Sequence, residues 1–334
     1  MGNSGLKVSR IILGGMSFGS SKWQEWVLDE HEAIPVIDHA YKSGINTWDT
    51  ADVYSFGQSE EIIGKALRQL HIPRERVVIL SKCYFGLKEP GQKFDISSLF
   101  TNDGELVNRV GLSRKHIFDA VEASVKRLGT YIDVLQIHRL DRATPREEIM
   151  RALNDVIDKG WVRYIGASSM AAWEFQQLQN IADKHGWHKF ISMQNYYNLI
   201  YREEEREMIP YCQNAGIGLV PWSPMAGGVL ARPWTERNTK REETDKLVKD
   251  LSRDRSLKSD EDIVNRVEEL ANQKKVSMAE ISIAWHLSKG TNPVLGLSKI
   301  ERIDDAVAAL KVELSEDEIR YLEEPYLPKR VQGY

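Results

Sequence analysis

Short apolar runs alternate with longer amphipathic segments along the whole chain. The apolar runs have the length and composition of strands, and several are continuous Val, Ile and Leu stretches. Continuous runs of this kind are typical of parallel strands that are buried on both faces. The pattern predicts eight strands, at Ile11–Gly15, Asn46–Asp49, Val77–Lys82, Ile132–His138, Val162–Ala167, Phe190–Gln194, Gly218–Trp222 and Pro293–Gly296.

The amphipathic segments carry helix-start and helix-stop signals. A capping box with Pro at the first helical position is predicted at residues 144–147, and a second capping box at residues 277–280. Glycine follows several of the other segments, as expected where helices end. The predicted helices are His31–Ser43, Ser59–Gln69, Arg114–Leu128, 146–159, Ala171–His185, Glu203–Ala215, Asp260–Lys275, 278–289, Ile300–Leu310 and Ser315–Glu323.

Eight strands alternating with helices favour a closed parallel (β/α)₈ barrel over an open doubly wound sheet. The glycines at residues 14–19 do not have the G-x-G-x-x-G spacing of a dinucleotide-binding open sheet. We expect residues 1–334 to form one barrel domain. Two long connections, Phe85–Leu112 and Ser223–Ser259, follow the third and seventh strands, and in a barrel this is the catalytic side. The charged run Thr235–Asp250 within the second is interpreted as a solvated helical face.

Composition narrows the function classes. Lys and Arg number 45 against 49 Asp and Glu, a net charge of −4, so no basic surface for nucleic acid is indicated. No apolar run approaches the ~18 residues that span a bilayer. The two cysteines, Cys83 and Cys212, are too few for a disulfide framework and are expected to be buried in a reducing compartment. We therefore expect a cytoplasmic protein without a membrane or nucleic-acid partner.

Ionisable and polar groups stand at the ends of three consecutive predicted strands. Asp49 ends the second strand and is followed by Tyr54, Lys82 ends the third, and His138 ends the fourth. We call these four residues the tetrad. A Lys cation favours the phenolate and is expected to lower the pKa of Tyr54, while Asp49 neutralises Lys82 and His138 binds a substrate oxygen. The set predicts a general acid placed over a carbonyl that an external hydride donor reduces.

Taken singly, each of these residues has a simpler interpretation. A buried Lys–Asp pair can be structural, a strand-end His can be a satisfied core residue, and a Tyr after a strand can serve packing alone. Their coincidence at three neighbouring strand ends favours the chemical interpretation. A metal-dependent hydrolase is disfavoured, because no second strand-end His accompanies His138, and no metal site is predicted.

The run DTADVYSFGQSE at residues 49–60 resembles the D-T-A-x-x-Y-G-x-S-E signature of the aldo-keto reductases. IGKAL at residues 63–67, Lys82 after its strand, and His138 in LQIH match the same family, and the resemblance extends over nearly the whole chain. It implies that Asp49, Tyr54, Lys82 and His138 are the catalytic residues, with NADPH/NADP+ as cofactor and a small carbonyl or alcohol compound as substrate.

The resemblance also implies a cofactor site. Ser168 and Ser169 stand where the family often has Ser-Asn, and Gln194 matches a glutamine that reaches the nicotinamide carboxamide. Trp222 matches the ring that stacks on the nicotinamide, although a core Trp is an equal alternative. The remaining expected contacts are Ser223, Pro224, Gly227 and Gly228 at the pyrophosphate, and Gly296, Ser298, Lys299 and Arg302 at the adenosine 2′-phosphate. Lys299 and Arg302 favour NADPH over NADH.

Within the family, residues 163–170 and 137–141 resemble the fungal aryl-alcohol dehydrogenase and versiconal hemiacetal acetate reductase group. The resemblance implies aromatic or bulky aldehydes, ketones or hemiacetal-derived carbonyls. Aromatic residues after the first and third strands could line such a pocket, although ordinary loop anchoring explains them equally well: they are Trp23, Trp26, Phe85, Phe94 and Phe100.

One departure from the family concerns the fold. Members usually begin with an additional strand, so we expect a shortened N-terminal hairpin in which Lys7–Ile12 lack pairing partners. A rival function is also open, that of a cofactor-binding regulatory subunit of the same superfamily that acts on a partner protein. The oligomeric state is not predicted.

Overall fold

The eight predicted strands form one parallel sheet. The computed structural model describes residues 1–87, 99–236, 244 and 257–334. Strand order is β7-β6-β5-β4-β3-β2-β1-β8. The bounds are β1 Ile12–Gly14, β2 Thr47–Asp49, β3 Val78–Cys83, β4 Ile132–Ile137, β5 Val162–Ser168, β6 Phe190–Gln194, β7 Gly218–Leu219 and β8 Val294–Leu295.

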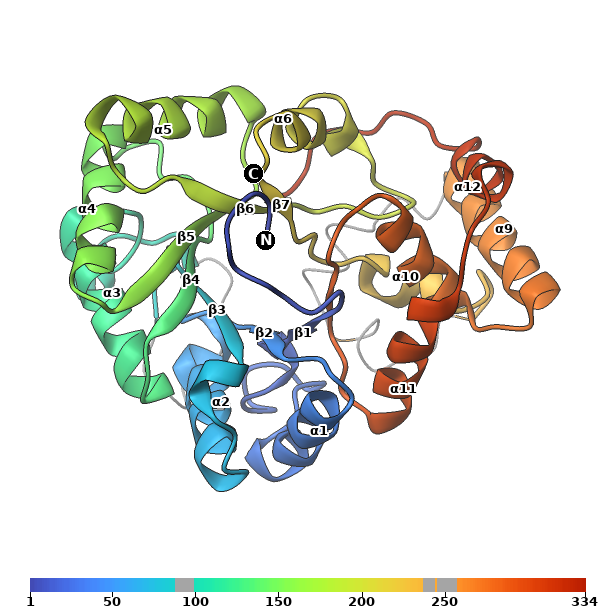
Figure 1. Cartoon of the computed structure of the whole chain (residues 1–334), viewed down its shortest axis with the longest axis horizontal. Helices are drawn as coiled ribbons and strands as arrows, with labels where there is room; N and C mark the ends of the chain where they lie inside the picture. The colour runs from blue at the N-terminus through green and yellow to red at the C-terminus, as the bar shows by residue number, and fades with distance from the viewer. Residues whose placement is uncertain (88–98, 237–243, 245–256) are drawn as a thin grey trace.

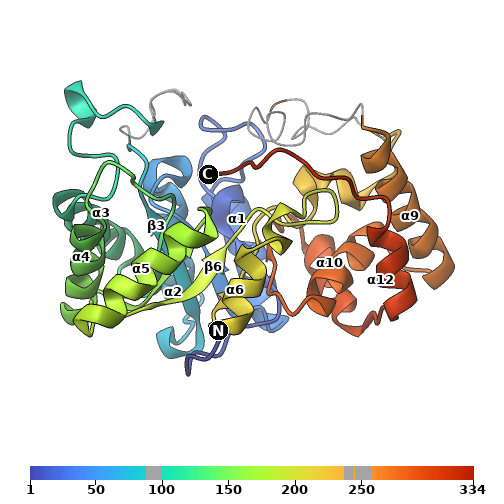
Figure 2. The same cartoon turned by 90° about the horizontal axis from the view of Figure 1, so that it is seen from above.

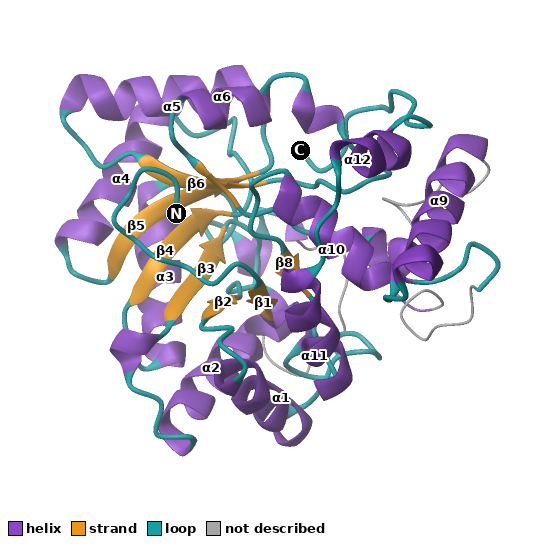
Figure 3. Ribbon diagram, turned by 45° about the vertical axis from the view of Figure 1, so that its right-hand side comes forward, coloured by secondary structure: helices purple, strands orange, loops and turns teal. Residues whose placement is uncertain are grey.

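The sheet curls into the predicted (β/α)₈ barrel (Figure 3). The first strand pairs with both β2 and β8. Between β7 and β8 the backbone closes through two hydrogen bonds, from Asn292 N–H to Leu219 O at 2.9 Å and from Val294 N–H to Pro221 O at 2.9 Å. We call this junction the β7–β8 seam.

Helices surround the sheet (Figure 1). They are α1 Glu30–Lys42, α2 Gln58–Gln69, α3 Arg114–Leu128, α4 Arg146–Asp158, α5 Ala172–His185, α6 Met208–Asn214, α9 Lys258–Lys274, α10 Met278–Ser288, α11 Ile300–Ala308 and α12 Glu316–Glu323. In the described residues no helix is both long and apolar enough to cross a membrane.

Side-chain alternation along the strands separates two apolar regions and positions the functional groups. Val78 and Leu80 of β3 lie in a small cluster with Val134 of β4, whereas Ile79 and Cys83 belong to the large core under the helices. Since successive side chains point to opposite faces, Lys82 shares the face of Val78 and Leu80, inside the barrel. The same period places Asp49 opposite Trp48, which packs into the large core.

The N-terminal segment closes one end of the barrel, at the starts of the strands (Figures 1 and 2). Met1, Leu6 and Val8 pack against the interior cluster of β3 and β4. Asn3 N–H donates to Gly216 O at 2.7 Å, just before β7. Residues 1–11 contain no strand, but the expectation that Ile12 lacks a pairing partner is wrong, because Ile12 begins β1 and pairs with Val294 of β8.

Two helix predictions need correction. Thr144 does not cap α4, because its hydroxyl donates to Asp141 and Pro145 occupies the cap position without a side-chain cap. The predicted helix Glu203–Ala215 is split into a 3-10 turn at Glu203–Glu205 and α6, because the backbone leaves the helical region at Glu207, which has a φ of −141°. The capping box at Ser277 is confirmed. Most of the run Thr235–Asp250 lies outside the described residues.

Candidate active site

The tetrad converges at the carboxyl ends of β2, β3 and β4. Asp49 is the last residue of β2, Lys82 is the fifth residue of β3, and His138 directly follows β4. Tyr54 begins the 3-10 helix η2 (Tyr54–Gly57) in the loop after β2. The parallel register brings Asp49 beside Leu80, and Lys82 beside Gln136 of β4. Residues far apart in sequence therefore meet at one end of the barrel.

Lys82 is the centre of the tetrad. Its Nζ donates to Asp49 Oδ1 at 2.5 Å, to Thr50 O at 2.8 Å and to Tyr54 Oη at 3.3 Å. These three acceptors match the three donors of an ammonium group. Burial alone would lower the pKa of Lys82, but the charges and hydrogen bonds of Asp49 and Tyr54 raise it above its ordinary value. Lys82 is therefore a cation at neutral pH.

The second oxygen of Asp49 is held by two amides. Gln136 Nε2 and Gln194 Nε2 each donate to Asp49 Oδ2 at 2.9 Å, and Gln194 Nε2 also donates to Gln136 Oε1 at 3.1 Å. Sequence reasoning gave Gln136 no role. Its signal is the period of two, because Gln136 and His138 share the inner face of the strand that ends at His138. The two amides fix the carboxylate that neutralises Lys82.

A tight turn fixes the position of Tyr54. Ser55, Phe56 and Gly57 follow it with φ of 50°, 55° and 92°, all in the left-handed region. Two consecutive non-glycine residues in that region store strain, which is common next to functional sites. Ser55 Oγ accepts a hydrogen bond from Ser20 N–H at 3.2 Å, which ties the turn to the loop after β1.

The expected pKa shift of Tyr54 is wrong in its net direction. Burial raises the pKa of Tyr54 above 10, and this effect outweighs the opposing charge of Lys82, with Asp49 adding to the rise. Lys82 acts in the predicted direction, but the sequence does not reveal how completely the phenol is enclosed. Tyr54 is therefore a protonated phenol at neutral pH, able to give a proton.

His138 is a neutral imidazole. Burial, and then the charges of Lys82 and Arg139, hold the pKa of His138 well below its usual range. Its ring meets that of Tyr54 edge-on, with centroids 5.8 Å apart. Nδ1 is buried without a hydrogen-bond partner among the described residues. The two side chains thus place a phenol and a neutral imidazole side by side.

Aromatic residues flank this pair on both sides. Trp23 lies 6.4 Å from the Tyr54 ring and packs with Trp26 in one cluster, and Phe85 lies 4.8 Å from the His138 ring. Phe100 is exposed and meets Phe85 edge-on at 5.3 Å. The structure therefore brings Trp23, Trp26 and Phe85 around the tetrad. Phe94, which was expected in the same wall, lies outside the described residues.

Trp222 follows β7 and faces the same end of the barrel. Its ring stacks on Tyr196, with centroids 4.6 Å apart and planes at 25°, and its Nε1 donates to Ser169 Oγ at 3.1 Å. Ser169 has a φ of 42°, and its hydroxyl is occupied in orienting the Trp222 ring. A Cβ on Gly333 would lie 3.3 Å from Trp222 Cζ2, so the chain near its carboxyl end borders the ring.

Two other predicted cofactor residues, Ser168 and Gln194, already make hydrogen bonds within the protein. Ser168 Oγ donates to Gln194 O at 2.9 Å, and the Nε2 of Gln194 is used by Asp49 and Gln136. With its amide nitrogen bonded in this way, Gln194 keeps its Oε1 for a ligand. Gln194 thereby connects the predicted cofactor contacts to Asp49.

The loop after Trp222 is a tight turn with left-handed backbone at four positions. Ser223, Ala226, Gly227 and Gly228 all have positive φ, from 48° to 100°. The backbone N–H groups of Ala226 and Gly228 donate within the loop, to Ser223 O at 2.9 Å and to Met225 O at 2.8 Å. The hydroxyl of Ser223 accepts from Gly227 N–H at 3.2 Å and holds the loop closed, and Pro224 is buried. Gly227 and Gly228 have no side chains, so a pyrophosphate could approach this loop closely.

The start of α11 has the features expected of a phosphate site. Lys299 is the N-cap of α11, and both Lys299 and Arg302 are exposed. Arg302 Nη1 donates to Ser298 Oγ at 3.1 Å, and exposed Gly296 lies just before them. Two cations at a helix N-terminus, where the dipole also favours anions, fit the 2′-phosphate of NADPH.

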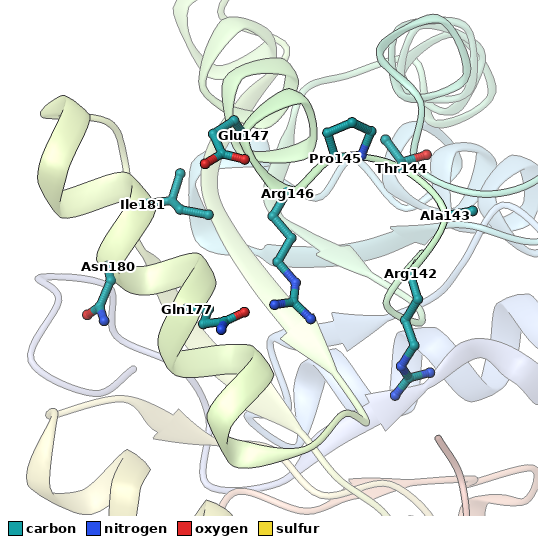
Figure 4. A pocket seen from close by; sticks show the side chains of 9 residues that line it. All are labelled: Arg142, Ala143, Thr144, Pro145, Arg146, Glu147, Gln177, Asn180 and Ile181. Atoms are coloured by element: carbon teal, nitrogen blue, oxygen red, sulfur yellow. The ribbon is translucent and has the colours of Figure 1, made fainter.

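A separate surface groove lies between the loop after β4 and α5 (Figure 4), lined among others by Arg142, Arg146, Gln177 and Ile181. Both arginines are already paired with a carboxylate. Arg142 makes two 2.8 Å hydrogen bonds to Glu174, and Arg146 lies 3.5 Å from the same residue. This groove therefore presents neutralised charge and lies apart from the tetrad.

Comparisons with known proteins agree with this geometry. The family model described as the aldo/keto reductase family matches residues 10–326. A versiconal hemiacetal acetate reductase of Aspergillus parasiticus is 63% identical over 99% of this chain and 97% of its own length. Putative aryl-alcohol dehydrogenases of Schizosaccharomyces pombe and Saccharomyces cerevisiae are 56% and 53% identical, covering 96% and 97% of their lengths.

Proposed function

Because this chain belongs to the aldo/keto reductase family, we propose that it is an NADPH-dependent reductase of aldehydes, ketones or hemiacetal-derived carbonyls, which can also run in reverse as an NADP+-dependent alcohol oxidation. The observation that carries the proposal is the hydrogen bond from Lys82 Nζ to the Tyr54 hydroxyl, within a cluster that also includes neutral His138. A protonated phenol beside a cation and an imidazole is suited to protonating a carbonyl oxygen.

NADPH, when bound, supplies a hydride to the carbonyl carbon. The residues of this chain carry out the rest of the reaction. Tyr54 gives its hydroxyl proton to the carbonyl oxygen as the C–O double bond is lost, and the Lys82 cation stabilises the phenolate that forms. His138 binds the same oxygen, because a neutral imidazole can donate one N–H. Asp49, held by Gln136 and Gln194, keeps Lys82 in place for this transfer.

Three segments at the carboxyl ends of the strands would bind the three parts of NADPH. The Trp222 ring, Ser168, Ser169 and the Oε1 of Gln194 would hold the nicotinamide. The left-handed loop from Ser223 through Pro224 to Gly227 and Gly228 would hold the pyrophosphate, and the segment Gly296, Ser298, Lys299 and Arg302 would hold the adenosine phosphate.

The substrates we propose are aromatic or bulky carbonyl compounds. Trp23, Trp26 and Phe85 would form the pocket walls, since aromatic side chains favour flat apolar ligands. The names of the relatives support testing aryl aldehydes and hemiacetal acetates first. The cytoplasmic location and the single domain remain predictions from the sequence.

Replacement of Tyr54 by Phe tests the proposed acid. We expect Tyr54→Phe to abolish aldehyde-dependent NADPH oxidation while leaving NADPH binding, followed by tryptophan fluorescence, within about threefold of wild type. Tyr41→Phe, which removes the hydroxyl from a ring of α1 that packs on Trp48, is the matched control and should keep activity. Unchanged turnover in Tyr54→Phe would refute this role. If wild-type protein binds NADPH but reduces none of a panel of aryl aldehydes and hemiacetals, the regulatory-subunit alternative is favoured.

Replacement of Lys299 by Glu tests the cofactor preference. We expect the KM for NADPH to rise at least tenfold while the KM for NADH changes little, since NADH lacks the 2′-phosphate. Lys311→Glu reverses the same charge at another exposed position and should affect neither. Equal changes for both cofactors would contradict the assignment.

A further inference from the structure

Arg139, which directly follows His138, is unused by the proposed reaction. It is half-buried at the mouth of the tetrad. Its Cζ lies 5.9 Å from the centroid of the Trp222 ring and 6.0 Å from that of Phe85. These two rings belong to the proposed nicotinamide and substrate contacts, and the guanidinium is within about 6 Å of both. It is therefore placed to meet a substrate.

The charge of Arg139 has no carboxylate partner in the described part of the chain. Among the described residues it makes one hydrogen bond, from Nη1 to His138 O at 2.6 Å, and the other four of its five donors have no partner there. Nearby Arg142 differs, because Glu174 holds it with two hydrogen bonds. Burial lowers the pKa of Arg139 to about 10, against the opposing effect of the Tyr54 and Tyr84 phenols, so it stays charged at neutral pH.

A half-buried cation without an anion is costly, and proteins keep such groups where a ligand completes the pair. A guanidinium fits a carboxylate best, because its parallel N–H groups bond both oxygens at once. The flanking Phe85 and Trp222 rings favour a flat, aromatic body on the molecule that carries this carboxylate. Arg139, Phe85 and Trp222 together therefore favour a ligand with a negative charge and a flat aromatic ring.

We propose that Arg139 is a specificity residue that selects aromatic carbonyl substrates carrying a carboxylate. The inference rests on the proposed reductase function and adds the substrate class to it. The carboxylate pairs with the Arg139 guanidinium while the carbonyl oxygen faces Tyr54 and His138. Arg139 takes no part in hydride or proton transfer, and its effect is on which substrate is held.

A matched pair of aldehydes tests this selection. The pair consists of 4-formylbenzoate and its methyl ester, which have the same ring and carbonyl but differ by one charge. We expect the wild-type ratio of their kcat/KM values to exceed 10 in favour of the carboxylate. In Arg139→Met this ratio should fall at least tenfold. Arg139→Lys keeps the charge but lacks the two parallel N–H groups of the guanidinium, so its ratio should be intermediate. Arg109→Gln removes an exposed positive charge from the loop after β3 and should keep the wild-type ratio.

Direct binding separates this proposal from the proposed function. Isothermal titration of 4-formylbenzoate into wild type and Arg139→Met, both with saturating NADP+, measures recognition without turnover. At least tenfold weaker binding in the variant supports the role of Arg139 even if neither aldehyde is reduced. Equal binding in both proteins, or equal kcat/KM ratios in both, would overturn it. A wild type that reduces the ester as well as the carboxylate would also overturn it, while leaving the reductase function intact.

Discussion

Removing the charge of Lys82 should destabilise the protein more than removing the whole Lys82–Asp49 pair. The two side chains are 0% and 3% exposed, and Nζ lies 2.5 Å from Oδ1. At that distance their gross attraction is about 7 kcal/mol with an effective dielectric constant of about 20. Taking each ion out of water costs several kcal/mol, so the intact pair contributes little net stability.

The single and double variants should therefore differ. Lys82→Met leaves the Asp49 carboxylate buried with only the Gln136 and Gln194 amides, a loss of about 3–5 kcal/mol. With about 2 °C per kcal/mol for a chain of this size, Tm should fall by about 6–10 °C. The double variant Lys82→Met with Asp49→Asn keeps an oxygen for both amides and removes the charge, so its Tm should return to within about 4 °C of wild type.

Thermal unfolding followed by circular dichroism at pH 7 and one fixed scan rate measures these differences. Asp49→Asn alone is the remaining corner of the cycle, and it should also lower Tm because Lys82 then loses its counter-ion. A double variant as unstable as the sum of the two single variants would refute the reasoning. That result would mean that the pair stabilises the fold directly, rather than being retained at this position for its chemistry.

Two further predictions concern stability. Burial raises the pKa of Glu204 to about 7, against the hydrogen bonds from Tyr334 and Asn195, so its contribution to stability is full below pH 4.5 and is lost as pH rises to 7. The difference between the folded and unfolded pKa of Glu204 is worth about 3 kcal/mol of stability. Glu204→Gln should therefore raise Tm relative to wild type by about 6 °C at pH 8 but not at pH 4.5. A Tm difference between variant and wild type that is the same at both pH values would contradict this. A Cβ on Gly64, in the middle of α2, would lie 2.4 Å from Leu128 O, so Gly64→Ala should cost about 1–3 kcal/mol although Ala favours helix by about 1 kcal/mol. Gly5→Ala is the comparison, because a Cβ at Gly5 meets nothing within 4 Å, and an unchanged or higher Tm in Gly64→Ala would show that α2 and α3 can move apart at little cost.

The strands and their order could be predicted from sequence, because strands that are buried on both faces appear as continuous apolar runs. A run such as Ile132–Ile137 has one structural interpretation once helices flank it on both sides. The helix before Gly160 was predicted less well at its start. Thr144 and Glu147 have the spacing of a capping box. Asp141 accepts hydrogen bonds from both the Thr144 hydroxyl and the Ala143 N–H, so the Thr144 hydroxyl does not cap the helix. Such competition between neighbours depends on geometry that spacing does not contain.

Convergence of the tetrad was predictable, and its electrostatics were not. Four chemical groups at neighbouring strand ends must approach one another in a closed barrel. The net pKa shift of Tyr54 depends instead on the balance between burial and one cation, which requires the enclosing atoms. Gln136 and Arg139 both lie within the strand-end stretch of polar residues. Only the structure distinguishes an amide bonded to Asp49 from a cation that meets no carboxylate among the described residues.

The β7–β8 seam gives the barrel a point from which it can open. Both hydrogen bonds across it come from the β8 side, and Pro221 has no N–H to return. Trp222 continues from one edge of the seam and Gly296 from the other. A dinucleotide held by both segments would bridge the two edges and stabilise the closed barrel. The amides of Asn292 and Val294 should then exchange with solvent faster in the free protein than in the cofactor complex, because the bound ligand would make local opening of the seam more costly.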